Sequence, residues 1–220
     1  MIVIATNNGN QFLGPLIKNL NDINCKLPIA VIDTNSTDPS FVDFVHQLPQ
    51  NNPNLNLKTY TTPGKNYDTG AYMYAIQNLQ AERYYFLHDS ITIKTPIIFE
   101  EIDKKLIPGV VVGLTIFWKD MYENEEQRQF CRDNWGTTQF DHGIFGPMFS
   151  ILRTDLEKAW SDLPKILPTN KNEQKAMERG WSVFCTKNNL KVISLENLSF
   201  NFKNIYRDRF AHFKKFTPQR

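Results

Sequence analysis

The sequence predicts an α/β fold with a mostly parallel, doubly wound central sheet. The first observation behind this prediction is that strand and helix patterns alternate through the first half of the 220-residue chain. The second is that two apolar strand patterns run into a carboxylate followed at once by turn residues, at Asp33 and at Asp89. Because ligands of open α/β folds bind at the carboxyl ends of parallel strands, these two residues predict a binding site at that edge.

The first half of the chain provides four of the expected strands. Short apolar or alternating runs predict strands over 2–5, 28–33, 55–61 and 84–88. Helical periodicity predicts helices over 11–20 and 38–48, and a third that begins at 68 or 69 and ends near 79. Asp38 followed by Pro39 is typical of an N-cap and a first helical residue, and Pro49 is expected to end that helix.

The second half is less regular. Apolar runs predict a long strand over 110–118, a strand near the end of 143–152 and a short one over 192–195. Residues 122–132 are expected to form a polar helix or loop, and helices are expected over 154–163 and 170–179. Gly180 is expected to end the last of these helices, because glycine is favoured just past a helix C-terminus.

The charge, the cysteine spacing and the apolar stretches of the sequence argue against several classes of protein. A formal net charge of +2 argues against a dedicated nucleic-acid-binding protein. The three cysteines have no Cys-x-x-Cys spacing, which argues against a disulfide framework or a structural zinc site. The start of the chain lacks a signal-peptide pattern, and its longest apolar stretch, 110–118, is too short for a transmembrane segment. We therefore expect a single-domain cytoplasmic protein.

The loops after the first two strands are candidates for nucleoside binding. Thr6 and Asn7 follow the first strand without a dinucleotide or P-loop glycine pattern, and their side chains can bind a base or ribose or simply form a turn. Asp33, at the end of the second strand, can accept hydrogen bonds from ribose hydroxyls or a base N–H. Alternatively, it starts an Asx-turn in the loop that follows.

Two further candidates precede the helix at 68 or 69. Free N–H groups and the helix dipole favour an anion at a helix N-terminus, and Lys65 would add a positive charge there. Asp68 is placed to orient sugar or ribose hydroxyls, or else to cap the helix.

The segment His88-Asp89-Ser90 is the sharpest candidate. Hard cations such as Mg²⁺ or Mn²⁺ bind one or two carboxylates together with substrate phosphates. A carboxylate at the end of a buried strand suits that role, because the hydrogen bonds of the sheet fix its direction. The alternative is that Asp89 caps the turn into residues 91–94.

Four segments in this order, 2–10, 31–38, 67–70 and 85–90, together resemble a GT-A glycosyltransferase. More narrowly, they are similar to family-2-like enzymes and to the small glycosyltransferase domains of large DNA viruses. The resemblance covers about residues 1–95, and more loosely 145–180. It implies one GT-A-like domain with a nucleotide-sugar-binding half (1–95), an acceptor half (96–202) and a basic C-terminal arm (203–220). A viral origin would imply a location in the host cytoplasm.

The resemblance implies transfer of a sugar from a UDP-, GDP- or dTDP-linked donor to a hydroxyl of a glycan or glycoprotein, in glycan biosynthesis. Thr6, Asn7 and Asp33 would bind the nucleoside, with Lys65, Asp68 and His88 as further substrate-binding residues. Asp89 would hold Mn²⁺ or Mg²⁺. The family's Asp-x-Asp motif has two carboxylates, whereas this chain has only Asp89 in that segment. A late histidine often completes the metal site in the family, and His212 is the candidate here, or else a surface residue.

The catalytic base and the acceptor site are less defined. Inverting members use an acid from the second half as general base, and Glu173 and Asp141 are the candidates. Glu173 also fits a capping box with Asn170, and Asp141 also fits a simple turn before Gly143. Trp118 can form an acceptor platform or pack in the interior. An inactive nucleotide- or carbohydrate-binding protein and a sugar nucleotidyltransferase remain alternatives.

Overall fold

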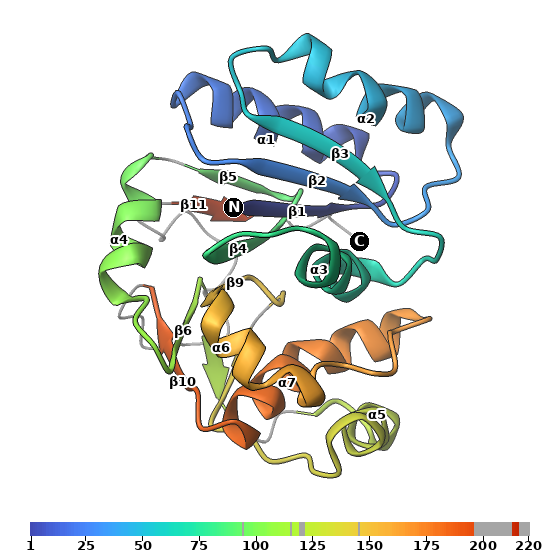
Figure 1. Ribbon diagram of the computed structural model, residues 1–220. Coiled ribbons are helices and arrows are strands. Elements are labelled where there is room, and N and C mark those ends of the chain that lie inside the picture. The colour runs from blue at the N-terminus through green and yellow to red at the C-terminus, as the bar shows by residue number, and fades with distance from the viewer. Residues whose placement is uncertain (94, 115, 119–121, 145, 196–212, 216–220) are drawn as a thin grey trace.

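A seven-stranded sheet runs through the centre of the protein in the order β10-β6-β9-β4-β1-β2-β3. The computed structural model describes residues 1–220 except 94, 115, 119–121, 145, 196–212 and 216–220 (Figure 1). Strands β4, β1, β2 and β3 are mutually parallel, as are β10 and β6, whereas β9 runs antiparallel to β4 and β6. The predicted mostly parallel sheet is confirmed.

The first half contains every strand and helix that the sequence predicts. Its strands are β1 (Ile2–Thr6), β2 (Ile29–Asp33), β3 (Leu57–Thr61) and β4 (Arg83–His88), and its helices are α1 (Asn10–Asp22), α2 (Pro39–Asn51) and α3 (Tyr67–Asn78). Two further elements follow that were not predicted, β5 (Ile91–Ile93) and α4 (Ile97–Lys105). β5 pairs antiparallel with β11 (Phe213–Lys215), near the end of the chain.

The second half contains shorter strands and one long helix. In chain order these are β6 (Val110–Gly113), β7 (Ile116–Trp118), α5 (Glu125–Trp135), β8 (His142–Ile144), β9 (Phe149–Leu152), α6 (Arg153–Lys158), a 3₁₀ turn (Trp160–Asp162), α7 (Lys171–Lys187) and β10 (Lys191–Ser194). Asn124 caps α5 and Asn170 caps α7, each by accepting hydrogen bonds from backbone N–H groups of the first turn.

Several boundaries differ from the prediction; for example, the helix expected over 154–163 is divided between α6 and the 3₁₀ turn. The apolar run at 110–118 is not one strand, because β6 lies in the central sheet and β7 pairs with β8 in a separate two-stranded sheet. Pro49 does not end α2, which continues to Asn51. Gly180 does not end its helix either, because α7 continues to Lys187.

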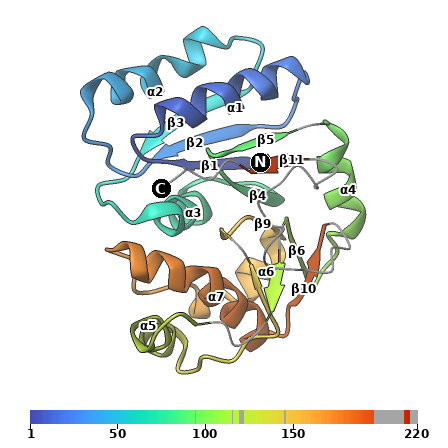
Figure 2. The ribbon, with the colours of Figure 1, turned by 180° about the vertical axis from the view of Figure 1, so that it is seen from behind.

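Helices cover both faces of the central sheet (Figures 1 and 2). Apolar residues of α1, α2 and α4 pack with one face of the sheet in one buried cluster. Residues of α3, α5, α6 and α7 pack with the other face in a second cluster, in which Trp181 and Tyr72 are fully buried. The sheet is therefore doubly wound, and its inner strands β1, β2 and β4 are buried on both sides.

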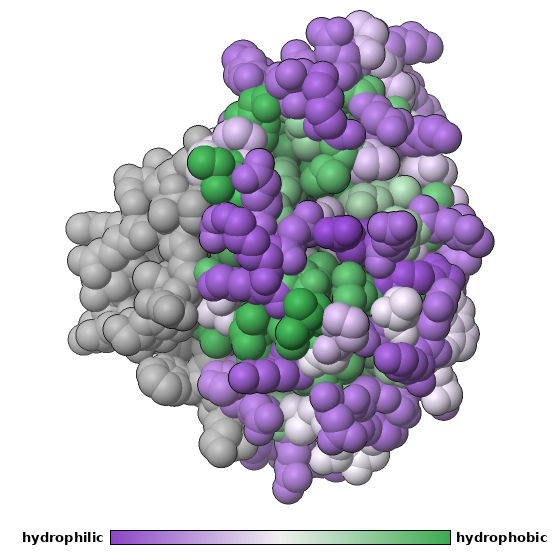
Figure 3. Space-filling model, turned by 60° about the vertical axis from the view of Figure 1, so that its left-hand side comes forward, coloured by the Kyte–Doolittle hydropathy of each residue, from purple (hydrophilic) through white to green (hydrophobic). Residues whose placement is uncertain are grey.

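The outer surface is mainly hydrophilic on the side seen in Figure 3, with apolar side chains gathered near its middle. Ile97 begins α4 and Ile107 follows its end, and these two large apolar residues are 47% and 57% exposed. No helix in the described part of the chain is both long enough and apolar enough to cross a membrane.

Gly180 lies where α7 packs closely against the indole of Trp135, on α5. A Cβ at Gly180 would lie 2.8 Å from two ring atoms of that buried indole. We expect Gly180→Ala to destabilise the fold by about 1–3 kcal/mol, since overpacking outweighs the better helix propensity of alanine. Gly14→Ala in α1 is the matched control, because its Cβ would make an ordinary 3.6 Å contact with Phe44. Urea unfolding should rank the control above wild type and Gly180→Ala below it; the reverse order would refute the packing argument.

Candidate functional site

The carboxyl ends of β1 and β4 open into a cavity of about 410 Å³. This is the edge at which open α/β folds bind ligands, as the sequence predicts. Its walls come from the loops after β1 and β4, from α1 and α3, from the segment before β9, and from α7. The lining residues are Asn7, Asn8, Gly9, Phe12, Asp68, His88, Asp89, Ser90, Gly146, Pro147, Lys171, Gln174, Lys175 and Glu178.

Asp89 sits where β1 and β4 end side by side. His88 pairs with Ala5 across these strands, which places Asp89 beside Thr6. The Thr6 hydroxyl donates a hydrogen bond of 2.7 Å to Oδ2 of Asp89. Gly9 packs so closely against this carboxylate that any Cβ would collide with Oδ2. Sheet register, a threonine and a glycine therefore fix the direction of the Asp89 side chain.

Burial makes the charged form of Asp89 costly. It raises the pKa of this carboxyl group from 3.8 to about 6, although the hydrogen bond from Thr6 and the charge of His88 both oppose the shift. A buried carboxyl group with a raised pKa at the end of a strand is typical of a functional site.

Asp68, on α3, lines the cavity and contacts α7. Its Oδ2 accepts a 2.7 Å hydrogen bond from the side-chain amide of Gln174, on α7. Nε2 of His88 lies 2.9 Å from the same oxygen, at ion-pair distance, although its N–H is not aligned for a hydrogen bond. Asp68 does not cap α3, whose N-cap residue, Asn66, also makes no side-chain capping bond.

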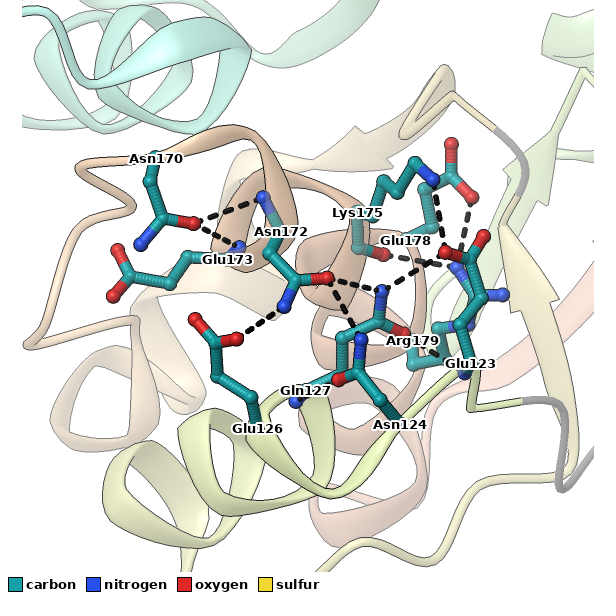
Figure 4. Close-up of polar contacts among 10 residues, drawn as sticks. All are labelled: Glu123, Asn124, Glu126, Gln127, Asn170, Asn172, Glu173, Lys175, Glu178 and Arg179. Carbon is teal, nitrogen blue, oxygen red and sulfur yellow. Dashed lines mark hydrogen bonds and ion pairs between the residues drawn. The ribbon is translucent and has the colours of Figure 1, made fainter.

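A network of polar contacts between α5 and α7 holds the first turns of α7 in place (Figure 4). Asn172 accepts hydrogen bonds from Asn124 at 3.1 Å and from Gln127 at 3.0 Å. Lys175 forms a 2.8 Å ion pair with Glu123. These contacts orient the face of α7 that lines the cavity.

Glu178 is an acid of α7 that lines the cavity. Its Oε1 accepts a hydrogen bond of 3.1 Å from the backbone N–H of Gly146, and its Oε2 pairs with buried Arg179 at 3.0 Å. Both carboxylate oxygens are thus held, and the segment before β9 is tied to α7.

The structure brings Thr6, Asn7, Asp68, His88 and Asp89 together around this cavity, as the sequence suggested. Asn7 lines it and donates its side-chain amide to the carbonyl of Thr34, 2.8 Å away. Thr6 does not line the cavity itself but donates a hydrogen bond to Asp89, which does. The proposed chemical roles of these five residues remain predictions.

Asp33 and Lys65 are not among the residues that line the cavity. Asp33 is buried at the end of β2 and accepts hydrogen bonds from the backbone N–H and hydroxyl of Ser36, which matches the turn-forming alternative. Lys65 is exposed, with its Nζ 5.9 Å from the ring centre of Tyr67. The structure therefore does not place these two side chains beside Asp89.

Neither candidate base reaches the cavity. Glu173 turns back to accept hydrogen bonds from the backbone N–H and hydroxyl of Thr169, so its carboxylate stabilises the start of α7. Asp141 is exposed, and its N–H donates to Thr186 near the other end of α7. Thr186 lies eight residues beyond Glu178, or about 12 Å along the helix axis. The capping and turn alternatives explain these two residues better than catalysis does.

Two further candidates fall partly or wholly outside what the structure describes. Trp118 ends β7, but its side chain is not among those described. His212 lies outside the described residues.

The sequence interpretation missed four cavity residues on α7: Lys171, Gln174, Lys175 and Glu178. Their spacing of three, one and three residues places them on one face of a helix, a signal that was present in the sequence. The family resemblance pointed instead to Glu173, which directly precedes Gln174 in the sequence.

The side chains of the cavity can bind a hard divalent cation only if a bound substrate supplies further oxygen ligands. Within the described residues, no three His, Cys, Asp or Glu side chains converge to hold a metal ion. One or two carboxylates completed by phosphate oxygens suffice for Mg²⁺ or Mn²⁺. Asp89 fits such a site, because a bound cation would offset the cost of burying its charge.

A larger cavity of about 710 Å³ lies at the opposite, amino-terminal edge of β4. Its two arginines are paired with carboxylates, Arg83 with Asp103 and Arg153 with Glu157. We favour the smaller cavity as the functional site, because it lies at the ligand-binding edge and contains the perturbed carboxyl group.

Asp89 should make stability depend on pH. Its pKa is higher in the folded than in the unfolded chain, so stability should fall as the pH rises from about 4 to about 6. Asp89→Asn should remove this dependence and stabilise the fold at pH 8 by at most about 3 kcal/mol, with little effect below pH 4. Chemical unfolding in EDTA would measure both.

Asp38→Asn is the matched control. The pKa of Asp38 is lowered by its hydrogen bonds to Ser40, so neutralising Asp38 should not stabilise the fold at pH 8. An Asp89→Asn variant no more stable than wild type at pH 8 would contradict the burial argument.

The fold matches solved structures of glycosyltransferases. TarS of S. aureus matches with a TM-score of 0.56 and 13% identity, over 98% of this chain and 36% of TarS. The mannosyltransferase PcManGT of Pyrobaculum calidifontis, in complex with GDP-Man and Mn²⁺, matches with a TM-score of 0.58 and 17% identity, over 88% of this chain and 53% of that one. Residues 1–349 of TarS in complex with UDP match with a TM-score of 0.53 and 13% identity, over 97% of this chain and 59% of that one.

The chain therefore spans between about one third and three fifths of the length of these proteins. No protein-family model matches the sequence, and no curated protein matches it either. The likeness is one of structure at low identity: this chain has a glycosyltransferase fold.

Proposed function

We propose that the protein is a glycosyltransferase that moves a sugar from a nucleoside diphosphate sugar to a hydroxyl acceptor. The observation that carries this proposal is the cavity at the carboxyl ends of β1 and β4. It combines Asp68 and Asp89 with two lysines of α7, Lys171 and Lys175, within a glycosyltransferase fold.

The composition of the cavity suits a ligand with an anionic centre and many hydroxyl groups. Lysines attract a diphosphate, whereas carboxylates accept hydrogen bonds from sugar hydroxyls. The similar structures with GDP-Man and Mn²⁺ and with UDP support a nucleotide sugar as the ligand class. The base and the sugar are left open between UDP-, GDP- and dTDP-linked donors.

We assign Asp89 to cation binding, and Lys171 and Lys175 to the charge of the leaving diphosphate. A bound Mn²⁺ or Mg²⁺ would act as a Lewis acid on that diphosphate. Such electrostatic stabilisation is commonly the largest contribution to catalysis. Asp68 and His88 would orient sugar hydroxyls, and Asn7 would contact the nucleoside.

In this proposal neither Glu173 nor Asp141 acts as the catalytic base. Glu178 replaces them in this proposal, because it is an α7 carboxylate that lines the cavity. Gly146 and Arg179 would fix its direction toward an acceptor hydroxyl in an inverting reaction.

One observation favours a second candidate, an inactive nucleotide- or carbohydrate-binding protein. The segment at the end of β4 supplies one carboxylate, and no three-ligand metal cluster occurs in the parts of the chain that are described. Calorimetry separates the two candidates. Mn²⁺-dependent binding of GDP-mannose or UDP-glucose with slow donor hydrolysis supports the transferase, and ligand binding without turnover supports the inactive protein.

We expect Asp89→Asn to lower sugar transfer or donor hydrolysis by about 100-fold or more, because it removes the carboxylate that holds the cation. The same variant should be at least as stable as wild type at pH 8, so its inactivity would not reflect misfolding. Retention of full Mn²⁺-dependent activity would exclude the metal role of Asp89.

Lys65 and Lys171 both contact the ring of Tyr67 and provide a matched pair of variants. Nζ of Lys171 and Nζ of Lys65 each lie 5.9 Å from the ring centre of Tyr67, but of the two only Lys171 lines the cavity. Lys171→Met should weaken UDP or GDP binding by about tenfold, with a smaller salt dependence, because an attraction to the diphosphate is lost. Lys65→Met should leave binding near the wild-type value. Equal losses in both variants would instead support the role first suggested for Lys65.

A further inference from the structure

Gln174 occupies an unusual position between the two sides of the cavity. It lies on α7, lines the cavity and is 4% exposed. Its side-chain Nε2 donates to Oδ2 of Asp68, on α3, at 2.7 Å. Its Oε1 is buried and has no hydrogen-bond partner among the described residues.

The partner of Gln174 fixes which way its amide group points. A carboxylate only accepts hydrogen bonds when it is ionised, so the amide nitrogen must face Asp68. The amide oxygen is therefore the atom left over. Leaving a buried acceptor unpaired costs free energy, and such a group calls for a donor that is not part of the described chain.

The same region holds other buried polar atoms without partners. The hydroxyls of Thr69 and Tyr72, both on α3, are fully buried and have no hydrogen-bond partner within the described part of the chain. Burial raises the pKa of Tyr72, and the charges of Asp68 and Asp89 raise it further. Several buried polar groups of α3 and α7 thus lack a partner among the residues that the structure describes.

We propose that Gln174 is a specificity-determining residue, whose side-chain oxygen accepts a hydrogen bond from a hydroxyl of the donor sugar. Its amide nitrogen holds Asp68 in place at the same time, so one side chain both orients a carboxylate and supplies an acceptor. This inference rests on the proposed transferase function and deepens it. It assigns to α7 a contact with the sugar, in addition to the diphosphate contacts proposed for Lys171 and Lys175.

The proposal predicts a loss that depends on the sugar. Gln174→Met is similar in length but offers neither the amide donor nor the oxygen acceptor. It should weaken binding of GDP-mannose or UDP-glucose, whichever wild type binds with Mn²⁺, by about tenfold. Binding of the corresponding GDP or UDP should change less than twofold. Gln174→Asn, which keeps the amide but shortens its reach, should show the same selective loss.

The controls separate local from general effects. Gln129→Met makes the same chemical change on the exposed side of α5 and should bind all ligands as wild type does. Thermal melts of each variant would show whether it is folded, and the milder Gln174→Asn variant provides the result if Gln174→Met unfolds.

Four outcomes would overturn the proposal. If both Gln174 variants bind the nucleotide sugar as tightly as wild type, the free oxygen is satisfied by water. If they lose the nucleotide and the nucleotide sugar equally, Gln174 supports the site as a whole. If wild type binds the nucleotide but gains nothing from the attached sugar, the sugar contact is absent, whereas failure to bind either ligand would refute the proposed function together with this inference.

Discussion

The burial of Asp89 at the end of β4 is the constraint on which the rest of the site depends. A carboxylate in this position is disfavoured as an ion because it is buried, and its side chain lies close against the backbone of Gly9. Thr6 donates to it from the neighbouring strand, and Gly9 gives it space that any side chain would fill. The fold thus holds an acid that would be more stable neutral, which is the usual state of a group kept for chemistry rather than for stability.

The opposite wall depends on α7, and α7 depends on its contacts with α5. Gly180 lets the two helices approach around Trp135, and the contacts of Asn172 fix the rotation of the first turns. A rotation of α7 by one residue, about 100°, would turn its lysines and Gln174 away from the cavity. Helix packing far from Asp89 therefore decides which polar groups face it.

The cavity combines groups from both parts of the chain. Asp68 and Asp89 come from α3 and the end of β4, within the first 95 residues, whereas Lys171, Lys175 and Glu178 come from α7. The hydrogen bond from Gln174 to Asp68 joins the two sides directly. A division into a donor half and an acceptor half is therefore not a boundary of the site, since a ligand in this cavity would touch both.

Local patterns in the sequence determined the strands and helices from β1 to β4, the cap at Asp38 and the position of Asp89 at a strand end. These features depend on residues close together in the chain, such as an apolar run followed by an acid. The tertiary structure alone decided that 110–118 divides between two sheets, that α7 passes through Gly180, and that Asp33 accepts hydrogen bonds from Ser36 and does not line the cavity. It also decided which face of α7 turns towards the cavity, namely the one that carries Gln174 and Glu178 and not Glu173. Each of these outcomes is set by a partner distant in sequence or by the rotation of a helix. The spacing of nearby residues encodes neither the distant partner nor the rotation.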